Sequence, residues 1–243
     1  MISMVRNMCT VHVHYTPDHL GSVWAGNRSK NSFEKHGWNV KLVEGHTPST
    51  VEFNHMLLPE GRTQFIINNN PERILVKLSI LSNHLRFWEM VSKGTGPMIY
   101  AEHETICVED KFDLPEFEDV LALHIDNKNN QYQSMHVNLN EDYFHYYLKE
   151  GIHDLPPDYP YEYTYPTKYE GAKIMVGASC YALTPQGATK LLTEVEEHGA
   201  EQGDMLINTK AVNIKYKTPA LVSMFHPISQ SYPINKKVTW DDE

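Results

Sequence analysis

The sequence predicts an α/β domain with a mixed, mostly parallel central sheet that is flanked by helices. The first observation is a helix over 77–92, whose apolar side chains recur at three- and four-residue steps: Leu78, Leu81, Leu85 and Trp88. The second is the Gly-rich turn 94–97, after which the short apolar run 97–101 is typical of a buried strand. A helix, a tight turn and a buried strand in succession form one unit of an α/β domain.

Length and composition predict a single domain over residues 1–243. A chain of 243 residues with 41% hydrophobic content can bury one sizeable core. No run approaches the roughly eighteen apolar residues of a membrane helix, and the first fifteen residues lack the apolar centre of a signal peptide. Three scattered cysteines form neither a disulfide framework nor a zinc motif. We therefore expect a cytoplasmic protein with reduced thiols and no membrane insertion.

The other elements follow in order along the chain. Residues 8–15 and 38–44 are expected to be strands, and segments 119–126 and 131–138 flank a polar turn, which predicts a hairpin. Residues 173–183 are expected to form a strand. The helix after it has Thr184 as its cap, Pro185 in its first turn and its end at Gly199.

Segment 143–169 is irregular and rich in tyrosine and proline. Aromatic rings can stack on sugars or on unpaired bases, and prolines stiffen a loop, so the segment could be a lid or an acceptor platform. Such a segment could equally cover one edge of the core. Both interpretations stay open at this stage.

Glu102 and Glu104 are the sharpest chemical feature. Side chains two residues apart on a strand point the same way, so both carboxylates could converge on one cation at the end of the buried strand. Strand ends in open α/β sheets bind ligands, and Mn²⁺ or Mg²⁺ suits carboxylate oxygens. The alternative is an ordinary solvated strand end. The formal net charge of −10 counts against a dedicated duplex-binding protein, and it means that an anionic ligand would need a cation or well-placed donors.

Three ordered blocks resemble family 25 glycosyltransferases, which include bacterial lipooligosaccharide galactosyltransferases and the collagen galactosyltransferases. The first is LSNHLRFWEMVSKGTGPMIYAEHE (81–104), in which Glu102-His103-Glu104 takes the place of the family's Glu-Asp-Asp. The second is GASCYALTPQGATKLL (177–192), and the third is Gly203-Asp204-Met205-Leu206. The resemblance implies a Rossmann-like domain of the GT-A type, with residues 1–105 binding the nucleotide sugar and residues 106–243 binding the acceptor.

The resemblance also implies a metal site and a base. Glu102, His103 and Glu104 would hold Mn²⁺ or Mg²⁺, with His226 as a further ligand, and imidazole is a suitable replacement ligand for such ions. Asp204 would be the general base that deprotonates the acceptor hydroxyl. The local alternatives are a loop histidine for His226 and a helix cap for Asp204.

For substrate contacts, the resemblance places Ser82 and His84 toward the donor nucleotide, with Arg28 as a possible basic residue after the first strand. Gly177 and Tyr181 would line the acceptor side. Core packing is the alternative for His84, Gly177 and Tyr181.

The expected function is therefore metal-assisted, inverting transfer of a sugar from a nucleotide donor, UDP-linked by family analogy, to a hydroxyl acceptor. That acceptor is a glycan or, if this is a viral modifying enzyme, a hydroxylated nucleobase. The alternative is a non-catalytic nucleotide- or partner-binding module that kept the fold, with His103 marking the lost metal site. No G-x-S-x-G, P-loop or G-x-G-x-x-G pattern supports a hydrolase or dinucleotide-binding protein.

Overall fold

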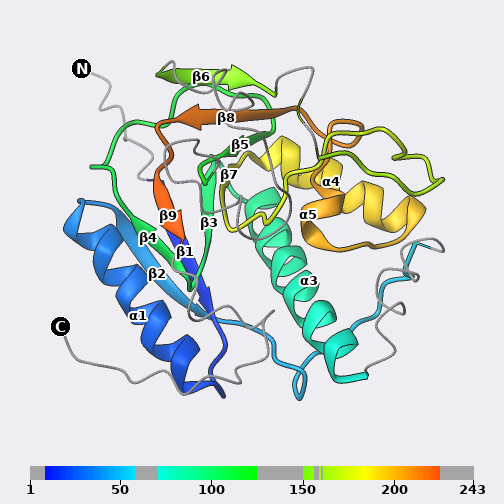
Figure 1. The fold of residues 1–243 in the computed structure, drawn as a ribbon, viewed down its shortest axis with the longest axis horizontal. Helices are drawn as coiled ribbons and strands as arrows, with labels where there is room; N and C mark the ends of the chain where they lie inside the picture. The colour runs from blue at the N-terminus through cyan, green and yellow to red at the C-terminus, as the bar shows by residue number, and fades with distance from the viewer. Residues whose placement is uncertain (1–8, 59–70, 125–149, 156–158, 160, 225–243) are drawn as a thin grey trace.

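The computed structural model describes residues 9–58, 71–124, 150–155, 159 and 161–224 (Figure 1). Its helices are α1 (Leu20–Lys35), α3 (Pro71–Ser92), α4 (Pro185–His198) and the short α5 (Gly203–Leu206). Its strands are β1 (Thr10–Tyr15), β2 (Asn39–Glu44), β3 (Met98–Glu102), β4 (Thr105–Cys107), β5 (Val120–Ala122), β6 (Gly151–Asp154), β7 (Cys180–Leu183), β8 (Ile214–Thr218) and β9 (Val222–Met224).

Seven of these strands form one sheet in the order β2-β1-β3-β7-β5-β8-β6. Strand β1 is parallel to β2 and β3, and β8 is parallel to β5. Strand β7 runs antiparallel to both of its neighbours, β3 and β5, and β6 runs antiparallel to β8 at the edge. All strands of this sheet but β7 and β6 therefore point the same way, and β4 pairs with β9 in a separate antiparallel sheet. The expected mixed, mostly parallel sheet of a single Rossmann-like α/β domain is confirmed.

Two apolar layers cover the sheet. Helices α3 and α4 pack together over one face, where Trp88, Tyr100 and Tyr181 belong to the larger core (Figure 1). Helix α1 contacts β1, β2 and β4 on the other face, where Phe33 belongs to a second core. Side chains alternate between the faces of a strand, so Glu102 shares the α3 face with Tyr100.

The local signals around α4 are confirmed. The Thr184 hydroxyl accepts a hydrogen bond from the backbone N–H of Gly187 at 3.0 Å, and Pro185 occupies the first turn. Gly199 follows the helix with a φ of 93°, a left-handed conformation that glycine adopts without steric cost. No helix in the described part of the chain is long and apolar enough to cross a membrane.

Three expectations about elements differ from the structure. Helix α3 begins at Pro71, six residues before the expected start, because proline is well suited to a first helical turn. Strand β7 covers only the end of 173–183, because Gly177 (φ 80°) and Ala178 (φ 38°) turn the backbone just before it. The expected first hairpin arm contains β5, which pairs with β7 and β8, while residues 131–138 lie outside the described residues.

Part of the tyrosine-rich segment 143–169 lies in the core. Tyr159, Tyr163 and Tyr169 are buried and belong to the larger apolar layer. These three rings therefore match the interpretation that the segment covers the core. Residues 143–149, 156–158 and 160 lie outside the described residues.

Candidate functional site

Glu102 and Glu104 lie where β3 ends, beside the carboxyl end of β1. Glu102 is the last residue of β3 and is in register with His14 of β1, while Glu104 belongs to the turn that leads into β4. The turn is closed by the Thr105 hydroxyl, which donates to the Glu102 carbonyl at 2.7 Å. The expectation that one strand aligns both carboxylates is therefore wrong in detail, because a turn separates them.

The two carboxylates nevertheless share one electrostatic environment. Burial raises the pKa of Glu102 well above its usual value, and the nearby charges of Glu104 and Asp204 raise it further. Burial raises the pKa of Glu104 to about 7. The imidazole Nε2 of His103 lies 3.8 Å from a Glu104 carboxylate oxygen. Negative charge is therefore costly here unless a proton or a cation offsets it.

Asp204 lies near this group in space, although it belongs to a much later segment of the chain. It lies in the first turn of α5, whose N-cap residue is Gln202, so Asp204 is not the helix cap. Gly203 packs against α3: a Cβ built on it would lie 2.5 Å from Cδ2 of His84. The absence of a side chain at Gly203 thus lets α5 approach α3 and brings Asp204 into electrostatic contact with Glu102.

His84 of α3 is almost fully buried, and its ring lies against Gly203, the residue before Asp204. Its Nδ1 is 2.9 Å from the Tyr181 hydroxyl, and the same hydroxyl accepts a 2.9 Å hydrogen bond from the indole N–H of Trp88. Its ring stacks on Tyr100 with 4.4 Å between centroids. Burial lowers the pKa of His84 to about 3, so the imidazole is neutral at neutral pH. Tyr181, expected at the acceptor side, is fully buried with its hydroxyl bound to these two side chains.

The remaining expected residues are distributed around and beyond this group. Ser82 is hydrogen-bonded to Nδ1 of His46 at 2.7 Å, which ties α3 to the loop after β2. Gly177 lies in the turn before β7. In the same segment, the backbone carbonyl of Ser179 accepts a 2.8 Å hydrogen bond from the Glu102 backbone N–H.

Arg28 is not part of the group. Arg28 is exposed on α1, which packs on the opposite face of the sheet, and its guanidinium lies 5.4 Å from the ring centre of Trp24. His226 lies outside the described residues.

Sequence reasoning missed Glu201. This fully buried side chain accepts a hydrogen bond from the Gln202 backbone N–H at 2.9 Å and lies 3.5 Å from the Tyr163 hydroxyl. Burial, followed by the charge of Asp204, raises its pKa to about 7, while Lys77 of α3 acts in the opposite direction. The residue occupies a loop with no periodic pattern, so its burial has no local sequence signal.

His14 lies beside this group on β1, the strand next to the edge strand β2. The ring is buried against Tyr100, 4.6 Å away, and neither of its nitrogens has a hydrogen-bond partner among the described residues. Burial lowers its pKa well below the usual value.

The donor set fits a hard divalent cation in its chemistry. Glu102 and Glu104 are buried carboxylates whose charges repel, and carboxylate oxygens are the ligands that Mg²⁺ and Mn²⁺ prefer. Among the described residues, no group of three or more His, Cys, Asp or Glu side chains is arranged to hold a metal ion. Any further ligand would have to come from a substrate, from water or from residues outside that part of the chain.

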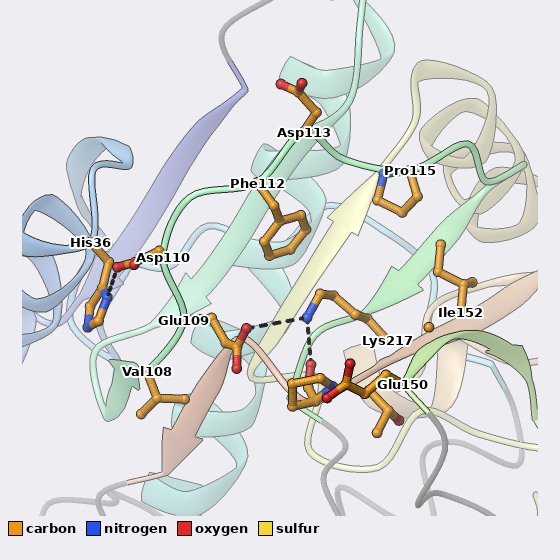
Figure 2. A pocket seen from close by; sticks show the side chains of 13 residues that line it. His36, Val108, Glu109, Asp110, Phe112, Asp113, Pro115, Glu150, Ile152 and Lys217 are labelled. Carbon is orange, nitrogen blue, oxygen red and sulfur yellow. Dashed lines mark hydrogen bonds and ion pairs between the residues drawn. The ribbon is translucent and has the colours of Figure 1, made fainter.

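A separate open depression of about 690 Å³ lies on the opposite face of the sheet (Figure 2). Lys217 crosses it, with Nζ 4.6 Å from the ring centre of Phe112 and 3.9 Å from a Glu109 carboxylate oxygen. At its margin, Nδ1 of His36 lies 2.8 Å from Asp110. None of the expected site residues that the structure describes lines this depression.

Comparison with known proteins adds no relative. No protein-family model matches the chain, and no curated protein matches it. The family resemblance therefore stays a prediction that depends on the three motif blocks.

Proposed function

We propose that the chain is a metal-assisted glycosyltransferase that moves a sugar from a UDP-linked donor to a hydroxyl acceptor. The observation that carries the proposal is the meeting of Glu102, Glu104 and Asp204. The acidic pair comes from the first block of the sequence and Asp204 from the third, and Asp204 lies in electrostatic contact with Glu102 at the carboxyl end of β3. A site at that end of a mostly parallel sheet is where α/β domains bind ligands.

Two carboxylates repel an anionic donor, so the acidic pair supports donor binding only if a cation is bound as well. Glu102 and Glu104 would hold that cation. When bound, it would neutralise the charge that develops on the departing diphosphate. The fold contributes the buried setting in which that charge compensation is strong.

Asp204 is the proposed general base. It would take the proton of the acceptor hydroxyl while the acceptor oxygen forms a bond to the anomeric carbon. The bond from that carbon to the diphosphate oxygen breaks, and the electron pair leaves with the diphosphate. Asp204 lies close enough to Glu102 for their charges to interact, and a carboxylate at that place is a suitable general base for a hydroxyl. Direct displacement by one acceptor inverts the anomeric configuration.

A glycan is the proposed acceptor, and the resemblance is its support. A hydroxylated nucleobase is the second acceptor class that an assay should include. The net charge of −10 disfavours long-range attraction to duplex DNA.

The deciding experiment is thermal denaturation with a panel of nucleoside diphosphates and nucleotide sugars, each with and without Mn²⁺. We expect one base to raise the melting temperature only when the metal is present. The double variant Glu102→Gln, Glu104→Gln should lose this stabilisation, whereas Glu109→Gln, on the other face of the sheet, should keep it.

Two results would contradict the proposal. Stabilisation by a nucleotide that needs no metal and survives the double substitution would indicate the non-catalytic binding module. Absence of stabilisation by every compound in the panel would remove the nucleotide-sugar donor altogether. Turnover with glycan and nucleobase acceptors then separates the two acceptor classes.

A further inference from the structure

A chain of three buried side chains leads from the core to the acidic group. Trp88 and His84 lie one helical turn apart on α3, and both reach the hydroxyl of Tyr181 on β7 at 2.9 Å. All three residues are almost completely excluded from solvent. Hydrogen bonding in such a place has to be satisfied within the protein.

The hydrogen-bond donors and acceptors that these three side chains carry allow one arrangement of their protons. An indole N–H can only donate, so the Tyr181 oxygen accepts from Trp88. The hydroxyl has one proton of its own to donate, and among the described residues its acceptor is Nδ1 of His84. The reverse arrangement, with Nδ1–H donating to Tyr181, would leave the tyrosine proton buried without an acceptor. His84 therefore carries its own proton on Nε2.

That Nε2–H faces the segment that carries Asp204. A Cβ built on Gly203 would lie 3.1 Å from Nε2, so this nitrogen is at the contact between α3 and α5. The described residues supply no hydrogen-bond partner for it. This donor belongs to an almost fully buried side chain and lies next to the segment that carries Asp204, so it is available to a ligand.

We propose that Trp88 and Tyr181 are positioning residues that hold His84 in the Nε2–H form, so that His84 offers one fixed hydrogen-bond donor to an acceptor oxygen of the bound ligand. The identity of that ligand as the nucleotide-sugar donor rests on the proposed function. The arrangement of protons does not, because it follows from the contacts of the three side chains alone.

The test is a long-range ¹⁵N–¹H correlation spectrum of the full chain with ¹⁵N-labelled histidine, in which the two nitrogens of each neutral imidazole report which one is protonated. His84→Gln identifies the His84 signals by their disappearance. We expect the wild-type His84 to be in the Nε2–H form near neutral pH. Tyr181→Phe keeps the ring but removes the hydroxyl, and it should convert a substantial fraction of His84 to the Nδ1–H form. Tyr169→Phe is the matched control, since it removes a buried tyrosine hydroxyl that bonds to Glu194.

An Nδ1–H His84 in the wild-type spectrum overturns the inference, and this result needs no folded variant. An unchanged tautomer in Tyr181→Phe overturns it as well. Addition of the nucleotide that stabilises the protein should shift the Nε2 resonance, and Tyr181→Phe should lower turnover by about 10- to 100-fold with a smaller effect on KM, as for residues that orient a ligating histidine. An Nε2–H His84 that responds to no nucleotide would support the positioning role and count against the proposed function.

Discussion

Gly203 and the imidazole of His84 are in direct contact, with no room for a side chain between them. A Cβ on Gly203 would lie 2.5 Å from Cδ2 and 3.0 Å from Cγ of that ring. The ring cannot retreat easily, because Tyr100 stacks on it and Tyr181 bonds to it. Helices α3 and α5 can therefore lie at this distance because residue 203 is a glycine.

Gly203→Ala should consequently push α5 away from α3. We expect a loss of about 1–3 kcal/mol in the free energy of unfolding, the usual cost of overpacking, together with loss of ligand binding. Urea unfolding followed by tryptophan fluorescence measures the first and thermal shift measures the second. Gly171→Ala is the control, because open space surrounds that position and only its φ of 74° opposes a side chain. Equal binding by both variants would show that the contact does not position Asp204.

Glu104→Gln should stabilise the metal-free protein at about pH 8 while it removes metal-dependent binding. The raised pKa of about 7 means that an ionised Glu104 costs free energy in the folded state, and an amide avoids that cost. The gain should be about 1–3 kcal/mol, measured by urea unfolding in the presence of a chelator. A variant that is less stable than the wild type under these conditions would contradict the assigned environment of Glu104.

Glu201 should make stability depend on pH in a defined direction. Its folded pKa of about 7 lies above the usual value of 4.5, so the folded state binds more protons than the unfolded state between these values. The free energy of unfolding therefore falls as pH rises through this window, by up to about 3 kcal/mol from this residue, and stays lower above it. Glu201→Gln should flatten the difference between the values at about pH 5 and about pH 8. An identical slope in the variant and the wild type would show that Glu201 is not the source.

His14 should act in the opposite direction. Burial holds the pKa of its imidazole well below the usual value of 6.5, so only the unfolded state takes up the proton as pH falls below that value. The protein should lose stability on acidification for this reason. His14→Phe keeps an aromatic ring beside Tyr100 and cannot be protonated, so its unfolding free energy should fall less between about pH 7 and about pH 5. A variant with unchanged acid sensitivity would assign the effect to other histidines.

The elements that were predicted well have signals within a few residues. Thr184, Pro185 and Gly199 mark the ends of α4 through contacts that the helix makes with itself. The apolar run before Glu102 was recognised as a buried strand for the same reason. The early start of α3 differs from the expectation because Pro71 follows an Asn-rich run, which is typical of a loop, while the apolar repeat begins only later.

The fold brings together residues that the sequence named separately, and their role as a functional site stays a prediction. His84, Glu102, Glu104 and Asp204 were all named beforehand, and the fold brings them together. Their relation through Gly203 depends on how α5 packs on α3, which no local pattern encodes. Glu201 joined the group through the same packing, and its burial could not be read from a loop.

The position of β7 inside the sheet limits where the chain can be cut into fragments that fold. It lies between β3 and β5, so Met98 finds its partner only at Leu183, far along the chain. A fragment ending near residue 105 would leave β3 as an unpaired edge, the kind of surface on which other chains add strands. Such a fragment should aggregate on expression, and the growing chain faces the same exposure until β7 has left the ribosome. The acidic group can form only after that, so the nucleotide-sugar and acceptor halves proposed from the sequence would have to fold as one unit.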